Sequence, residues 1–149
     1  DVPVHLRSAP VPASDGGPVL ELVGSTFASA AYDASKDVLV QFYSPQCGHC
    51  RKLAPVYRSV AAKMATDGEM VVAQIDATAN DVEGLLPDGF PTIVFYPKGN
   101  KKGVEYDGSR DEHDILQFVA DARAGREHVG GLPEQLEGGD GFEGAKVEL

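Results

Sequence analysis

The fold is decided by residues 38–64, which read VLVQFYSPQCGHCRKLAPVYRSVAAKM. This stretch opens with a mostly apolar run, Val38–Tyr43, that is typical of a buried strand. After the first cysteine, apolar residues recur at three- and four-residue intervals, which predicts an amphipathic helix. They are Cys50, Leu53, Ala54, Tyr57, Val60, Ala61 and Met64. A strand therefore ends and a helix begins at the cysteines.

Both cysteines of the chain, Cys47 and Cys50, stand at this junction with Gly48 and His49 between them. Two intervening residues place both sulfurs on one helical turn, close enough to form a disulfide. The unpaired N–H groups and the positive dipole end of a helix N-terminus favour a thiolate there. We therefore expect Cys47 to attack a disulfide. Cys50, one turn later on the inward face, is expected to resolve the mixed disulfide that forms.

Two other uses of a Cys-x-x-Cys pair are weaker. A closed zinc site needs four ligands, usually Cys or His, and the chain has no second cysteine pair. Its histidines are scattered, at His5, His49, His113 and His128. A purely structural disulfide in such a small loop would remove little entropy from the unfolded chain. Redox chemistry is the better interpretation, and no metal is expected.

Four motifs in order give the chain a resemblance to a known family. Residues 42–55, 76–80, 90–96 and 106–110 resemble the active-site run and three later landmarks of the protein disulfide isomerase family. The resemblance covers about Pro18 to Ala124. It implies an α/β thioredoxin fold, with a mixed central sheet flanked by helices on both faces. The alternation of predicted strands and helices points to the same α/β class.

The resemblance also implies roles for single residues. His49 would favour the Cys47 thiolate as an imidazolium. Pro91 would be a cis-proline facing the active site, and with Phe90 and Gln46 it would contact an extended substrate. Arg110 would swing towards Cys50 and stabilise its thiolate.

Three residues depart from the family pattern. Gln46 stands where the family usually has a Trp, Gln41 where it keeps a buried Glu, and Gln74 where it keeps a Lys that can pair with that Glu. Since the last two changes replace both members of an ion pair, we expect the two amides to bond each other. The usual carboxylate acceptor for the Cys50 proton is then missing, so proton transfer through water or His49 is expected to be slower.

Composition divides the chain into three parts. Residues 1–17 are expected to be an inter-domain linker because they contain three prolines and two glycines without a sustained period. Residues 18–125 would form one thioredoxin-like catalytic domain, and the acidic, Gly-rich residues 126–149 a disordered tail. The ending, Lys146-Val147-Glu148-Leu149, resembles the K-D-E-L signal for endoplasmic reticulum retention.

The sequence also predicts the order of the elements. Strands are expected at 19–23, 38–43, 70–76, 92–96 and 103–106, and helices at 25–32, 48–66 and 82–86, with a last helix starting at Asp111. Ser25 is the expected cap of the first helix. Residues 98–100 would form a hairpin turn, and Ile115, Phe118, Val119 and Ala122 would face inward.

We therefore expect a protein disulfide isomerase, a thiol–disulfide oxidoreductase that needs no cofactor and acts in the endoplasmic reticulum lumen. Its partners would be unfolded or misoxidised secretory proteins, an oxidase and glutathione, and the chain would be a monomeric fragment of a multidomain protein. The net charge of −10 argues against nucleic acid, and no apolar run is long enough to span a membrane. The alternatives are a redox-weak, chaperone-like client-binding module and, third, a zinc-binding module.

Overall fold

The computed structural model describes residues 6–13, 17–82, 89–99 and 101–125. The chain divides into two compact units, Asp1–Tyr106 and Asp107–Leu149. The first unit holds five strands and two helices in the order β1 (Leu20–Leu22), α1 (Gly24–Ala31), β2 (Asp37–Tyr43), α2 (Gly48–Met64), β3 (Met70–Asp76), β4 (Thr92–Tyr96) and β5 (Val104–Tyr106). The second unit holds α3 (Glu112–Arg123).

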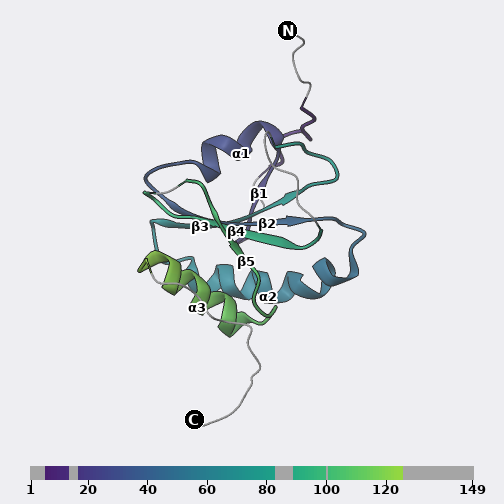
Figure 1. Cartoon of the computed structure of the whole chain (residues 1–149). Helices are drawn as coiled ribbons and strands as arrows, with labels where there is room; N and C mark the ends of the chain where they lie inside the picture. Colours follow the sequence, from purple (N-terminus) through teal and green to yellow (C-terminus); the bar gives the residue numbers. More distant parts are fainter. Residues whose placement is uncertain (1–5, 14–16, 83–88, 100, 126–149) are drawn as a thin grey trace. The chain divides into compact units, whose positions relative to one another are not determined.

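The strands of the first unit form one mixed sheet in the order β1-β3-β2-β4-β5. β1 and β2 both pair with β3 in parallel, whereas β4 runs antiparallel to β2 and to β5. Helix α1 covers one face of this sheet and α2 covers the other (Figure 1). This is the predicted fold, a mixed central sheet with helices on both faces.

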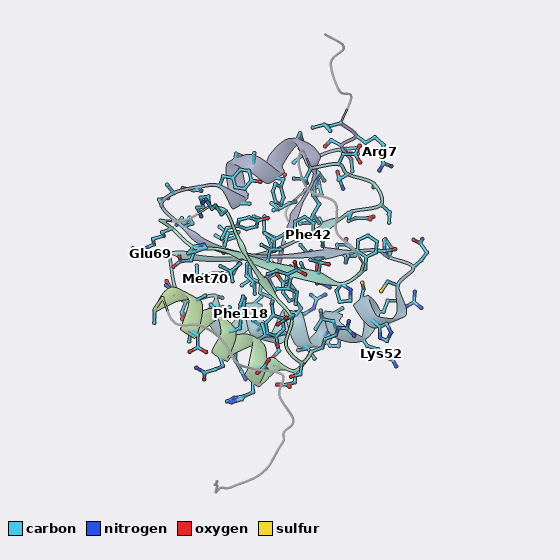
Figure 2. The ribbon with its side chains drawn as sticks, viewed as in Figure 1. Arg7, Phe42, Lys52, Glu69, Met70 and Phe118 are labelled. Carbon is cyan, nitrogen blue, oxygen red and sulfur yellow. The ribbon has the colours of Figure 1, made fainter. Side chains whose placement is uncertain are left out.

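Alternating side chains of β2 build the two sides of the core, because successive residues of a strand point to opposite faces. Val38, Val40 and Phe42 join the buried cluster that includes Phe27 and Ala31 of α1, and Figure 2 shows Phe42 on the sheet. On the opposite face, most of the predicted apolar stripe of α2 is buried, namely Cys50, Leu53, Tyr57, Val60 and Ala61. The prediction is wrong for Ala54, which is exposed, and Met64 is only partly buried.

Tyr57 fixes α2 to the centre of the sheet. Its ring is fully buried. Its hydroxyl donates to the carbonyl of Ala73 in β3 at 2.6 Å, and the carbonyl of Leu39 in β2 is a second, longer acceptor at 3.2 Å. Burial raises the pKa of this phenol well above its ordinary value, so it stays a hydrogen-bond donor at every physiological pH. The polar tip of Tyr57 therefore sets how α2 lies across β2 and β3.

The residues upstream of β1 are hydrogen-bonded to the first unit. We call Arg7–Ala9 together with Asn80 and Asp81 the N-terminal clasp. The Asp81 carboxylate accepts from the Arg7 backbone N–H at 2.7 Å and from its guanidinium at 2.9 and 3.1 Å, and the Asp81 N–H donates to the Arg7 carbonyl at 2.9 Å. Figure 2 labels Arg7 at the upper right, where the N-terminal segment meets the domain.

The N-terminal clasp also completes the start of α1. Asn80 Oδ1 accepts from the N–H groups of Ala9 at 2.7 Å and Gly24 at 2.8 Å. The Ser8 hydroxyl accepts from the N–H of Ser25 at 2.9 Å, so two donors that a helix leaves unpaired are satisfied from outside the helix.

Most predicted elements of the first unit are confirmed, although several bounds differ by one or two residues, and the predicted cap of the first helix is wrong. The predicted bounds of the strands at 70–76 and 92–96 agree with β3 and β4. Helix α2 ends at Met64 rather than at residue 66. Ser25 does not cap α1: the cap is Val23, whose N–H donates to Thr26 Oγ1 at 3.0 Å, so a side chain inside the helix supplies the acceptor. The predicted helix at 82–86 and the turn at 98–100 lie largely or partly outside the described residues.

The second unit begins its helix as predicted. Asp111 caps α3 by accepting from the N–H of Asp114 at 2.8 Å. A hydrogen bond from Ser109 and bonds from the helix N–H groups hold the pKa of Asp111 below its ordinary value. Ile115, Phe118 and Val119 are buried, whereas Ala122 is only partly buried. None of the helices in the described part of the chain is long and apolar enough to cross a membrane.

Candidate active site

The end of β2 presents the cysteines at the first turn of α2. After Tyr43 the chain leaves the sheet through Ser44, whose carbonyl accepts from the Cys47 N–H at 3.0 Å and closes a turn. Cys47 is extended, with φ −83° and ψ 121°, and is the N-cap of α2, so the helix begins at Gly48. On the outside, the Arg51 guanidinium donates to the Pro45 carbonyl at 3.1 Å and braces the same turn.

The two thiols are not joined by a disulfide, and their surroundings differ. Cys47 is partly exposed, and its sulfur accepts from the backbone N–H of Cys50 at 3.2 Å. This bond uses one of the unpaired N–H groups at the positive end of the α2 dipole, so it stabilises negative charge on Cys47 Sγ. Cys50 is only 4% exposed. An accessible thiol and a buried one thus share one helical turn.

A second segment meets Cys47 from the loop before β4. The Phe90–Pro91 peptide bond is cis, as the resemblance predicts. The Phe90 carbonyl lies 3.6 Å from Cys47 Sγ and accepts a hydrogen bond from it. The structure therefore brings together Cys47, Cys50, Phe90 and Pro91. That Pro91 and Phe90 bind substrate stays a prediction.

The remaining predicted residues around the thiols are exposed. Gly48 and His49 lie on the outer side of the first turn of α2, and Gln46 precedes it. The Ser44 hydroxyl donates a long hydrogen bond to Gln46 Oε1, at 3.4 Å. Lys52, labelled in Figure 2, lies on the first turns of α2 and is also exposed. Arg110 belongs to the second unit and is exposed, so its approach to Cys50 stays a prediction.

A polar row crosses the sheet on the α2 face. Glu21 of β1 is in register with Gln74 of β3, and Gln74 with Gln41 of β2. Gln74 Nε2 donates to Glu21 Oε1 at 2.8 Å, and the Tyr43 hydroxyl donates to Glu21 Oε2 at 2.9 Å. The expected bond between Gln41 and Gln74 is therefore wrong, because the neighbouring carboxylate on β1 is a stronger acceptor for the amide.

The polar row is bordered by a protonated phenol, that of Tyr43, and ends at the buried amide of Gln41. Burial, the hydrogen bond to Glu21 and the charges of Glu21, Asp76 and Cys50 all raise the pKa of Tyr43, so its phenol remains protonated. Gln41 is buried, at 2% exposure. Its side-chain amide makes no hydrogen bond within the described parts of the chain.

Sequence reasoning missed Glu21 and Tyr43 as neighbours of this site. Tyr43 was visible as the last residue of the strand before the cysteines. Glu21 was visible only as a lone acid between two leucines, Leu20 and Leu22. Among the residues that the structure describes, no group of three His, Cys, Asp or Glu side chains could hold a metal ion.

Comparison with known proteins agrees with this geometry. A family model described as Thioredoxin matches residues 18–121. Human protein disulfide-isomerase A4 is 47% identical over 118 residues, which cover 76% of this chain and 18% of that protein. Protein disulfide-isomerase of Aspergillus niger is 42% identical over 149 residues, covering 94% of this chain and 28% of its own length.

A solved structure gives the same answer for the fold. The solution structure of the first thioredoxin domain of mouse protein disulfide-isomerase A4 superimposes with a TM-score of 0.62 at 30% identity, covering 87% of this chain and 90% of that one. The chain therefore belongs to the thioredoxin family, and within it to the protein disulfide isomerases. It spans 18% and 28% of the length of the two curated relatives above.

Proposed function

We propose that this domain is a thiol–disulfide oxidoreductase and isomerase that forms, reduces and rearranges disulfides in secretory-pathway proteins. The observation that carries the proposal is the 3.2 Å hydrogen bond from the Cys50 N–H to Cys47 Sγ at the start of α2. It supports Cys47 as a stabilised thiolate that remains accessible to a client. The similarity to protein disulfide isomerases supports the same reaction class.

The reaction needs no cofactor. When the domain is reduced, Cys47 Sγ⁻ attacks a client disulfide, a Cys47–client S–S bond forms, and the other client sulfur leaves as a thiolate. Cys50, once deprotonated, can attack Cys47 Sγ, so that the Cys47–Cys50 disulfide forms and the client leaves as a thiolate. In the reverse direction, the Cys47–Cys50 disulfide passes to a client dithiol.

The geometry supports separate roles for the two sulfurs. Cys47 contacts the cis Phe90–Pro91 segment and remains partly exposed, so an extended client chain can lie beside the thiol. Cys50 is too buried for a client sulfur to reach it, but it stands one turn from Cys47. The first sulfur is thus suited to attack, and the second to release.

Two substitutions test these roles. Cys47→Ser should abolish both insulin reduction and reactivation of scrambled ribonuclease, because the attacking thiolate is lost. Cys50→Ser should accumulate mixed disulfides with clients, because attack survives and release does not. Equal turnover by Cys47→Ser and the parent would refute the assignment.

A redox-weak, chaperone-like module is the second candidate. Gln46 is exposed beside the thiols, where the family usually has a Trp, and Gln41 supplies no carboxylate. If this candidate is right, the parent should suppress aggregation of an unfolded client, and Cys47→Ser should do so equally well while neither protein reactivates scrambled ribonuclease.

We also propose that the protein works in the endoplasmic reticulum lumen, with secretory clients, an oxidase and glutathione as its redox partners. The similarity to protein disulfide isomerases supports this placement. So does the ending Lys146–Leu149, which differs at one position from a known retention signal. That ending lies outside the described residues, so the proposal rests on its sequence.

A further inference from the structure

The release step leaves a proton without an obvious acceptor. On the proposed function, Cys50 must become a thiolate before it can attack the mixed disulfide, and a thiol 4% exposed has little contact with bulk water. Gln41, the buried member of the polar row, carries an amide that cannot accept a proton at neutral pH. A carboxylate that accepts the Cys50 proton must therefore belong to another residue.

Glu21 lies on the correct face of the sheet. Leu22, Val40, Phe42, Ala73 and Ile75 belong to the cluster on the α1 face. Their sequence neighbours Glu21, Gln41 and Gln74 therefore point to the opposite face, which α2 and Cys50 cover. Parallel pairing of β1 with β3 brings the Glu21 carboxylate into the row that ends at Gln41.

Both oxygens of the Glu21 carboxylate accept hydrogen bonds that fix its orientation. Gln74 Nε2 donates to Oε1 at 2.8 Å, and the Tyr43 hydroxyl donates to Oε2 at 2.9 Å. Tyr43 also follows Gln41 by two residues on β2, so its phenol lies on the α2 face. A hydroxyl that donates its proton to Glu21 still has lone pairs that can accept a proton from a thiol.

Tyr43 and Cys50 share the face of the sheet that α2 covers. The charge of Cys50 is the smallest of the contributions that raise the pKa of the Tyr43 phenol, which agrees with this shared placement. The charged and titratable groups that act on Tyr43 are Glu21 of β1, Asp76 of β3 and Cys50 of α2.

We propose that Glu21 is the acceptor for the Cys50 proton, with Tyr43 as the bridge and Gln74 as a positioning residue. The Cys50 thiol gives its proton to the Tyr43 oxygen as Tyr43 gives its own proton to Glu21. The Cys50 thiolate then attacks Cys47 Sγ, the Cys47–Cys50 bond forms, and the bond from Cys47 to the client breaks. The client sulfur leaves with the electron pair, and Glu21 returns its proton to solvent.

Asp76 is the rival acceptor, because it is in register with Tyr43 on β3. Its Oδ1 already accepts from the Thr78 N–H at 2.9 Å and from the Thr78 hydroxyl at 2.6 Å. This carboxylate closes the loop after β3 and has no hydrogen bond to Tyr43. Asn at this position keeps an oxygen for Thr78, so Asp76→Asn is the matched control.

The test is the rate at which a preformed mixed disulfide between Cys47 and glutathione is resolved, measured from pH 6 to pH 10. Glu21→Gln and Tyr43→Phe should each slow release about tenfold or more at pH 7. The loss should disappear at the alkaline end, where hydroxide can deprotonate Cys50. Asp76→Asn should match the parent throughout. Adding Gln41→Glu to Glu21→Gln should restore release at pH 7, because it places a carboxylate back in the same row.

Three results would overturn the inference: parent-like release by Glu21→Gln at pH 7, slowing that is equal at every pH, or slowing by Asp76→Asn instead. A slowdown equal at every pH would indicate a structural role. The first step, formation of the mixed disulfide by Cys47, should be the same in all variants. If the parent itself forms no mixed disulfide, the proposed function fails, and that outcome is separate from a failure of the Glu21 relay.

Discussion

At the scale of single residues, Gly24 shows how tertiary contact can reverse a local preference. It is the first residue of α1, where alanine would normally be the better helix former by about 1 kcal/mol. A β-carbon at this position would lie 2.7 Å from the Arg7 carbonyl oxygen and 3.1 Å from Ser8 Cβ. Both atoms belong to the N-terminal clasp, so the glycine is needed for that close approach.

Gly24→Ala should therefore destabilise the protein by about 1–3 kcal/mol, despite the favourable helix propensity, because the clasp must move to relieve the overlap. Urea unfolding measures the change. Gly68→Ala is the matched control, because nothing lies within 4 Å of its added carbon, and it should stay within about 0.5 kcal/mol of the parent. A more stable Gly24→Ala protein would mean that the clasp yields without cost.

At the scale of elements, the N-terminal clasp joins a segment before β1 to the loop after β3. Its ion pair is exposed, with Arg7 and Asp81 side chains 62% and 33% accessible and 2.9 Å between Arg7 Nη2 and Asp81 Oδ1. The hydrogen bonds from Arg7 lower the pKa of Asp81, and those same bonds raise the pKa of Arg7.

The lowered pKa of Asp81 sets the pH below which the N-terminal clasp stops stabilising the folded state. Since folding lowers the pKa of Asp81, the clasp stabilises the folded state above the ordinary Asp pKa of about 4 and loses that contribution as the pH falls through the lowered value. Hydrogen exchange at the Ala9 and Gly24 amides should therefore accelerate in acid beyond the intrinsic rate. Asp81→Asn should weaken protection at neutral pH and remove the additional acid effect; protection that is unchanged in Asp81→Asn would show that the ion pair does not hold the clasp.

The elements differ in how far local sequence determines them. The bounds of β3 and β4 were predictable because their apolar runs are ended by Asp76 and bordered by Pro91. The cap of α1 was not, because both Ser25 and Thr26 have suitable hydroxyls. Only the structure shows that Ser8 already serves the Ser25 N–H, while Thr26 bonds Val23.

At the scale of the whole molecule, the parts of the site that are close in sequence were predictable and those joined by the sheet were not. The spacing of Cys47 and Cys50, followed by a helical period, was enough to indicate the dithiol and its place at the start of α2. The environment of Gln74 depends on which strand pairs with the outer edge of β3. Because β1 occupies that edge, Gln74 bonds Glu21 instead of Gln41.

The fate of the whole protein in the cell is also testable. Expressed behind a secretory signal, the chain should be retained in cells, and removal of Lys146–Leu149 should cause its secretion. Val147→Asp, which creates the known signal, should be retained at least as well as the parent. Equal retention with and without the last four residues would mean that they are not a retention signal.

The N-terminal clasp also changes the reach of anything joined upstream. A flexible tether of 17 residues has a root-mean-square span of about 23 Å, whereas one of six residues spans about 13 Å. Arg7–Ala9 are hydrogen-bonded to Asn80, Asp81 and the start of α1, so a segment joined upstream would depart from a fixed point on the domain. A neighbouring module joined there would have a shorter tether, and the volume from which it could hand a client to Cys47 would be correspondingly smaller.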